Sequence, residues 1–178
     1  MSIWKLLGFE KTAGQQTPQT EAVRRITEAL GEMEPERANY VAAFAYILSR
    51  VAHADLKVTE AETREMERIV QELGGLTPEQ ARIAVSIAKV RSKDHGATEN
   101  FLVTKEFDRM ATREQKLALL HCLFAVSASE ESISTIEENE IRQIATELSL
   151  EHREFIAVRY SFRDRIAVLQ QRREGSDE

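Results

Sequence analysis

Apolar residues recur at helical spacing through most of the chain, and no segment alternates apolar and polar residues over the length of a strand. Two segments, 35–51 and 117–126, are apolar nearly all round. A surface helix normally has one apolar face, so these two segments are predicted to be central, buried helices that pack on each other, with alanines allowing a close approach. The pattern as a whole predicts an all-α bundle of seven or eight helices.

Start and stop signals place further helices around the two central ones. Thr17-Pro18 and Gly31 bound a predicted helix, Gly74-Gly75 ends the helix after the first central one, and Thr77-Pro78 begins the next. Another is predicted around 101–110. A last helix is expected after Leu150, with 166–169 as its extension. The buried stripes of the two helices that follow the central ones are predicted to be Met66, Ile69, Val70 and Leu73, and Ile141, Ile144, Ala145 and Leu148.

The chain repeats part of itself at a shift of 75 positions. Without a gap, 48–73 falls on 123–148 with seven identical residues, where average residue usage gives roughly two by chance. The identical pairs are Leu48/Leu123, Val51/Val126, Glu62/Glu137, Glu65/Glu140, Ile69/Ile144, Glu72/Glu147 and Leu73/Leu148. Such a pattern predicts two pseudo-symmetric helix–loop–helix copies, at about 40–75 and 115–150.

The domain organisation predicted from this pattern is one helical domain, 18–169, with a short segment on either side. Residues 1–17 form an amphipathic segment and linker, and 170–178 form a polar tail. Trp4, Leu7 and Phe9 could touch a membrane surface or a partner, but anchoring normally takes two signals. We therefore expect this N-terminal patch to fold back onto the bundle, and peripheral membrane contact through residues 1–9 is the less favoured reading.

Both copies begin their second helix with the same motif. Thr59-x-x-Glu62 and Ser134-x-x-Glu137 are predicted capping boxes, in which the hydroxyl accepts from a backbone N–H and the glutamate reaches back to the cap. A structural role thus accounts for Glu62 and Glu137 without any ligand.

Asp55 and Glu130 are acids placed where each central helix ends. The negative end of a helix dipole disfavours an acid there by roughly 0.3–1 kcal/mol, so they are either solvated loop acids or parts of a site. If the two copies pack about a pseudo-twofold axis, these two acids would converge with Glu62 and Glu137. Carboxylates about 5 Å apart repel by roughly 3 kcal/mol, so such a cluster needs a cation, protons or basic partners, and all-oxygen ligands suit Ca²⁺ or Mg²⁺. The predicted metal ligands are Asp55, Glu62, Glu130 and Glu137.

The overall composition narrows the possible functions. A net charge of −6 argues against a nucleic-acid partner, because neutralising phosphates needs a basic face. The absence of a signal-like N-terminus and of a long apolar run predicts a cytoplasmic protein. Cys122 is predicted to be a buried thiol, and His121 a core histidine rather than a ligand. His53 could join a site beside Asp55.

Ala54-Asp55, a glutamate seven residues later and an apolar helix, within an all-helical duplication, together resemble the TerB-like tellurite-resistance family. The family pattern reads Ala-Asp-Gly, whereas Leu56 follows Asp55 here and the second copy reads Ser-Glu-Glu at 129–131. The resemblance implies a compact, non-catalytic, stress-associated helical domain that binds ions, membrane-associated assemblies or other proteins. Similar domains occur in membrane-anchored DnaJ-like co-chaperones.

Three functions follow from these patterns. The favoured one is a non-enzymatic TerB-like domain that binds protein partners and a divalent cation through its paired loop acids. The second is a protein-interaction or co-chaperone-type module without metal. The third, a metal-dependent enzyme that uses the same four carboxylates, is disfavoured because neither a nucleophile with its activating base nor a cofactor motif is found.

Overall fold

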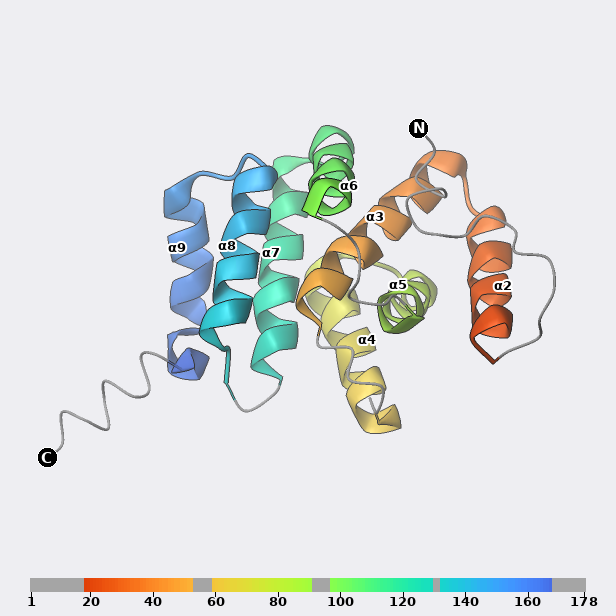
Figure 1. Cartoon of the computed structure of the whole chain (residues 1–178), viewed down its shortest axis with the longest axis horizontal. Helices are drawn as coiled ribbons and strands as arrows, with labels where there is room; N and C mark the ends of the chain where they lie inside the picture. The colour runs from red at the N-terminus through yellow and green to blue at the C-terminus, as the bar shows by residue number, and fades with distance from the viewer. Residues whose placement is uncertain (1–17, 53–58, 91–96, 130–131, 168–178) are drawn as a thin grey trace, which may run out of the picture.

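The structure is a computed structural model that describes residues 18–52, 59–90, 97–129 and 132–167. This part of the chain is helical and holds no strand, which confirms the all-α prediction. Its eight α-helices are shown in Figure 1: α2 (Pro18–Gly31), α3 (Pro35–Val51), α4 (Glu60–Gly74), α5 (Pro78–Val90), α6 (Ala97–Met110), α7 (Arg113–Ala128), α8 (Thr135–Glu147) and α9 (His152–Ser161). A short 3-10 helix, η1 (Arg163–Arg165), follows α9.

Helix α3 crosses the middle of the molecule and is buried along almost its whole length (Figure 1). It packs most extensively on α5 and α6 and also contacts α7 and α8. The predicted contact between the two central helices is therefore confirmed, but α7 packs more extensively on α4 than on α3. A helix that is apolar on all sides needs several neighbours to cover it. Helix α3 obtains them from α5 and α6, which lie between the two copies, and from α7 and α8 of the second copy.

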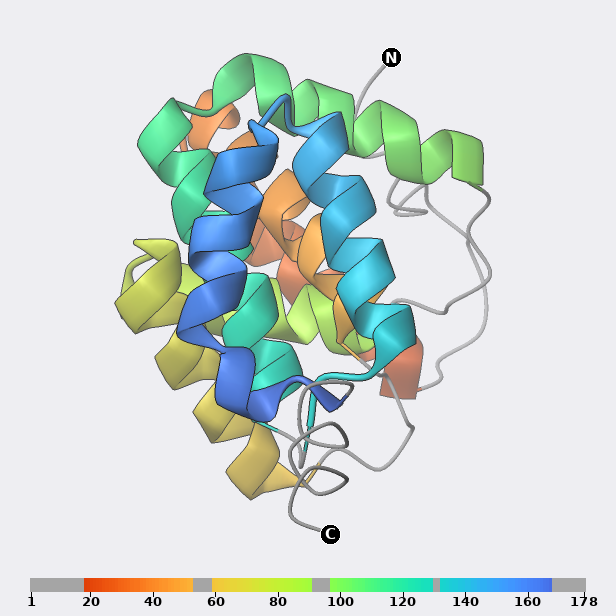
Figure 2. The same ribbon diagram turned by 90° about the vertical axis from the view of Figure 1, so that its left-hand side faces the viewer.

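Helices α7, α8 and α9 contact one another, and Figure 2 shows α8 and α9 side by side. Helix α2 lies at the other end of the molecule, against α5 and α3 (Figure 1). Phe124 links the α7–α9 group by ring contacts with Phe155 and Phe162. The buried side chains form one continuous core from Ile26 to Ile166.

Local sequence signals explain where the helices begin. Thr59, Thr112 and Ser134 each form a complete capping box with the residue three positions later. Each box satisfies two backbone N–H groups that the first helical turn would otherwise leave without a partner. Proline opens α2, α3 and α5, as predicted, because its fixed φ suits the first helical position.

Gly75 ends α4 in the left-handed conformation, with φ of 66°, as the Gly74-Gly75 pair predicts. A Cβ at Gly75 would meet no atom within 4 Å, so the requirement for glycine lies in the backbone alone. Gly75→Ala is expected to lower the free energy of unfolding by about 1–2 kcal/mol, because an L residue is strained at positive φ. Gly31→Ala is the control, since Gly31 also has free space around it and does not have a positive φ. Urea unfolding of both variants measures the difference, and equal stability of the two would contradict the prediction.

The predicted buried stripe of α4 is wrong at one position. Leu73 is 40% exposed, whereas Met66, Ile69 and Val70 are buried. The inward position is taken by Gly74, where a Cβ would lie only 2.8 Å from Cζ of Phe44. The ring of Phe44 therefore occupies the space at the end of this helix, and Leu73 turns outward. In the second copy all four predicted residues are buried, including Leu148.

The last helix does not continue through Ile166 as predicted, and 168–169 of the expected extension lie outside the described residues. Helix α9 ends at Ser161, and after η1 the backbone at Ile166 is extended, with ψ of 116°. Ile166 forms an isolated parallel bridge with Ile133, in which the backbone N–H of Ile133 donates to the carbonyl of Arg165 at 2.7 Å. The N–H of Ala167 donates to the carbonyl of Ile133 at 3.1 Å. Ile133 and Ile166 are both buried, so their apolar side chains enter the core instead of continuing a helix.

Candidate functional site

Two of the four predicted metal ligands, Glu62 and Glu137, lie in the described part of the chain, and both complete capping boxes. Oε2 of Glu62 accepts from the backbone N–H of Thr59 at 2.6 Å and from its hydroxyl at 2.8 Å. Oε2 of Glu137 accepts the same two bonds from Ser134, at 2.8 and 2.5 Å. The predicted structural role of both glutamates is confirmed.

The two equivalent glutamates differ in their surroundings. Glu62 is exposed, and hydrogen bonds from the backbone and then the hydroxyl of Thr59 lower its pKa below the ordinary value. Glu137 is only 4% exposed, and it follows the segment in which Ile133 pairs with Ile166. Glu137 is therefore the less accessible of the two glutamates, and its Oε2 is occupied by the bonds from Ser134.

Asp55 and Glu130 lie outside the described residues, as does His53. Among the described residues, no group of three or more His, Cys, Asp or Glu side chains is arranged to hold a metal ion. The described parts of the chain thus do not bring Glu62 and Glu137 together with a third such ligand. The four-acid site remains a prediction.

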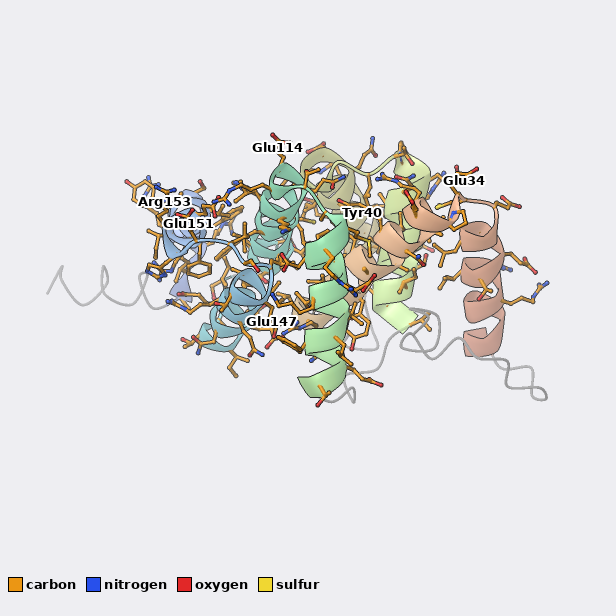
Figure 3. All side chains as sticks on the ribbon, turned by 90° about the horizontal axis from the view of Figure 1, so that it is seen from above. Glu34, Tyr40, Glu114, Glu147, Glu151 and Arg153 are labelled. Carbon is orange, nitrogen blue, oxygen red and sulfur yellow. The ribbon has the colours of Figure 1, made fainter. Side chains whose placement is uncertain are left out.

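A buried ionic network centred on Arg50 joins α3 to α8. Arg50 lies in the last turn of α3 and its side chain is 3% exposed. Its Nε donates to Oε1 of Glu140 at 2.7 Å, and its Nη1 donates to Oε2 of Glu147 at 2.6 Å. Figure 3 shows Glu147 between the ribbons of α8 and α6. The end of α3 is therefore held against α8 by charge-assisted hydrogen bonds, which are the stronger class.

Helix α6 completes this network. Nη1 of Arg50 also donates to the hydroxyl of Thr104 at 2.7 Å, and Gln143 donates to the second oxygen of Glu147 at 2.9 Å. One turn earlier on α3, the hydroxyl of Tyr46 donates to the side chain of Asn100 at 3.0 Å. Nη2 of Arg50 is buried without a hydrogen-bond partner among the described residues. One arginine thus connects three helices at the point where α3 ends.

The same network predicts a pH dependence of stability. Burial alone would raise the pKa of Glu147, but hydrogen bonds from Arg50 and Gln143 outweigh burial and lower it below 4.5. The stabilisation is therefore complete above pH 4.5 and is lost as the pH falls through the lower pKa of the folded state. We expect the urea midpoint to fall on acidification from pH 6 to pH 3, and to fall less steeply in Glu147→Gln. Glu32→Gln, at an exposed loop position, is the control and should keep the wild-type slope. An unchanged slope in Glu147→Gln would contradict this assignment.

A second charged cluster holds α9 on α8. Glu138 is buried, and both of its oxygens accept from Arg159, at 2.8 and 3.1 Å. Arg142 donates to Oε1 of Glu138 at 3.1 Å, and its guanidinium lies over the ring of Phe155 at 4.9 Å. This cluster joins α9 to α8 and gives the buried Glu138 two guanidinium partners.

The two reactive side chains of α7 have ordinary structural environments. Burial raises the pKa of the Cys122 thiol to about 12, so the nucleophilic thiolate is strongly disfavoured, as expected for a buried apolar thiol. Burial lowers the pKa of His121, which is half-buried and faces the ring of Phe162 at 6.3 Å between centroids.

Most of the described helices lie in the part of the chain that matches a known protein family. The model of the family described as tellurite resistance protein TerB matches residues 40–160, which is more than half of the chain. The chain belongs to the TerB family. The match begins within α3 and ends within α9, so the resemblance expected from the sequence is confirmed. No curated protein and no solved structure matches the chain.

The Arg50 network lies wholly within the TerB match, whereas α2 and η1 lie outside it. Sequence reasoning did not single out Arg50, although a charged residue in a helix that is apolar nearly all round was a signal that could have found it. Glu140 and Glu147 were noted only as members of the repeat. None of the described helices of this TerB protein is both long and apolar enough to span a membrane.

Proposed function

We propose that this chain is a cytoplasmic, non-enzymatic TerB domain that binds protein partners and a divalent cation through the paired acids Asp55, Glu62, Glu130 and Glu137. The family match supports the class of protein. The structural observation that supports a cation site is the ion pair between Arg50 and Glu140, which joins the end of α3 to α8.

Both residues of the Arg50–Glu140 ion pair are close in sequence to proposed ligands. Asp55 follows Arg50 by five positions, and Glu137 precedes Glu140 by three. Residues three apart on a helix are neighbours, with about 5–6 Å between their Cβ atoms. The ion pair therefore brings the guanidinium of Arg50, in the last turn of α3, to a glutamate that lies about one helical turn from Glu137, which supports the proposal.

The capping role of Glu62 and Glu137 is compatible with cation binding. A carboxylate has two oxygens and about four acceptor positions, and each cap uses Oε2. Calcium takes six to eight oxygen ligands, and magnesium keeps several waters, so four carboxylates with water suit either ion.

Calorimetric titration tests the proposal. We expect Ca²⁺ or Mg²⁺ to bind the wild type and to raise its melting temperature, because a ligand that binds only the folded state stabilises it. Binding should be lost in Asp55→Asn/Glu130→Gln. Glu60→Gln is the matched control, since Glu60 is an exposed acid of the same acidic region that is not a proposed ligand. Equal binding by the wild type and the double variant would contradict the ligand assignment.

The alternative is a protein-interaction or co-chaperone-type module without metal. Phe101 and Leu102 favour it, because these adjacent large apolar side chains are exposed on α6. Exposed apolar residues that lie together are typical of contact surfaces. Absence of both binding heat and thermal shift in the wild type, for Ca²⁺, Mg²⁺, Mn²⁺ and Zn²⁺, would leave this alternative in place of the cation site.

A further inference from the structure

The outer side of the α8–α9 pair carries exposed apolar side chains. Helices α8 and α9 lie side by side and face the viewer in Figure 2, with no other described helix in front of them. Ile156 and Tyr160 of α9 are 42% and 64% exposed. They are four positions apart on one helix, so their side chains are neighbours on the same side of it. Two large apolar side chains thus stand next to each other in water, as at surfaces that contact another molecule.

Three arginines surround these apolar side chains. Arg153 lies about one turn before Ile156, and its side chain is 80% exposed. Arg163 follows Tyr160 by three positions, and its guanidinium lies over the tyrosine ring, 4.5 Å from the centroid. The side chain of Arg142 on α8 is 46% exposed and reaches across to α9. We call Arg142, Arg153, Ile156, Tyr160 and Arg163 the α8–α9 face.

The acids of α8 do not balance these arginines. Three of them have partners on other sides of the helix, either the cap at its start or Arg50 of α3: Glu137, Glu140 and Glu147. The fourth, Glu138, is buried and accepts hydrogen bonds from both Arg142 and Arg159. One carboxylate therefore faces two guanidiniums, and a positive charge is left over on the outer side of the helix pair.

The acids of α9 leave the same imbalance. Glu154 binds Arg113 of α7, and Glu151 is shared between Arg113 and Arg153. Arg163 donates to a backbone carbonyl and not to any described carboxylate. The whole chain has 30 Asp and Glu against 24 Lys and Arg. An exposed surface on which arginines outnumber the free acids thus has the opposite sign to the chain as a whole.

We propose that the α8–α9 face docks an acidic segment of a partner protein, with carboxylates on its arginines and an apolar side chain against Ile156 and Tyr160. This inference rests on the protein-partner part of the proposed function and is independent of the cation. Charge complementarity selects the occupant, because a guanidinium and a carboxylate can form two parallel hydrogen bonds. Tyrosine and arginine are also, with tryptophan, the residues most enriched among those that carry the binding energy of protein interfaces.

A nucleic acid or an anionic membrane fits this face less well. Either one presents many negative charges, and the face has three arginines to neutralise them. The net charge of −6 means that the rest of the protein repels such a polyanion. A short acidic segment avoids this repulsion because it contacts the face alone, and its apolar side chain covers Ile156 and Tyr160.

Selection from a phage-displayed library of random peptides, with the wild type as the target, tests this inference. We expect the retained peptides to be richer in Asp and Glu than the library and to contain a large apolar residue. Synthetic copies of them should bind Tyr160→Ala/Arg163→Glu at least about tenfold more weakly than the wild type in fluorescence anisotropy. Their affinity for the wild type should fall as NaCl is added, because salt screens exposed charges. Neither changed side chain is buried, and circular dichroism checks that the variant is folded.

Two further variants show whether the effect belongs to this face. Leu73→Ala/Arg64→Glu is the matched control, because it changes an exposed leucine and an exposed arginine on α4 with the same change of charge. This control should bind the peptides like the wild type. Arg153→Glu changes the other end of the α8–α9 face and should weaken binding, as Tyr160→Ala/Arg163→Glu does.

The possible failures are distinguishable. Peptides that are not acidic, or that bind Tyr160→Ala/Arg163→Glu as tightly as the wild type, would overturn docking on the α8–α9 face and leave the protein-partner function in place. Equal weakening by the control on α4 would overturn it as well. A wild type that retains no peptide would overturn the protein-partner function together with this face. Single-stranded DNA or phosphatidylserine vesicles that bind the wild type and not Tyr160→Ala/Arg163→Glu would overturn the acidic segment as the occupant.

Discussion

Arg50→Met is expected to lower the free energy of unfolding by about 3–5 kcal/mol, which is the usual cost of removing one partner from a buried ion pair. Methionine is apolar and leaves Glu147 buried without its cationic partner, although Gln143 still donates to it. It also removes the bonds to Glu140 and Thr104 that join α3 to α6 and α8. Urea unfolding followed by circular dichroism measures the change as a shift of the midpoint at constant slope.

Arg68→Met is the matched control for this prediction. Arg68 also bonds two glutamates at 2.6 Å, but within its own helix and exposed to solvent. Exposed ion pairs contribute little because water screens them, so this variant should unfold close to the wild type. Adding Glu140→Gln and Glu147→Gln to Arg50→Met should recover much of the lost stability, since no buried charge then stays unpaired. A midpoint shift in Arg50→Met no larger than that in Arg68→Met would contradict a buried network.

Leu148→Ala is expected to cost about 2–5 kcal/mol, because Leu148 is fully buried and its removal leaves a cavity. Leu73 is the identical residue at the equivalent position of the first copy, but it is 40% exposed. Leu73→Ala should therefore cost less, about 1 kcal/mol, because 40% of the residue already contacts water and its removal leaves no enclosed cavity. The same substitution at two equivalent positions thus gives different results.

Chemical denaturation of both alanine variants measures this contrast directly. The two changes delete the same atoms at the C-terminal ends of equivalent helices, since Leu73 lies in the last turn of α4 and Leu148 is the C-cap of α8. Similar losses at Leu73 and Leu148 would mean that the outward orientation of Leu73 is wrong. A large loss of stability at Leu73 alone would mean that Leu73, and not Leu148, is the buried leucine of the pair.

Much of the fold could be predicted from local signals. Capping boxes at Thr59 and Ser134, prolines at the first helical positions and the left-handed Gly75 each act over three or four residues, so the sequence contains all that they need. The burial of α3 could also be predicted, because a helix without a polar face has no side to expose to water. The error at Leu73 has a different origin, since the ring of Phe44, 29 positions earlier, decides which residue of α4 turns inward.

At the candidate site, too, the local interactions could be predicted and the long-range ones could not. The capping roles of Glu62 and Glu137 are local and could be predicted, and both are confirmed. The pairing of Arg50 with Glu140 and Glu147 could not be predicted from the repeat, because the equivalent glutamates Glu65 and Glu72 take Arg68 of their own helix as their partner. Gln143 stands at the Arg68 position in the second copy, and the sequence does not say which distant arginine replaces it. Which arginine is used depends on where α3 ends relative to α8.

By itself, the sequence determined that this TerB protein is all-helical, where most of its helices begin and end, and which residues cap them. These features depend on hydrogen bonds and side-chain periodicity within a few residues of each other. Only the tertiary structure decided that α3 packs on α5 and α6, that Ile166 pairs with Ile133, and that one buried arginine joins the end of α3 to α8. These features depend on groups brought together from distant parts of the chain, and similar local sequences in two places are compatible with different arrangements.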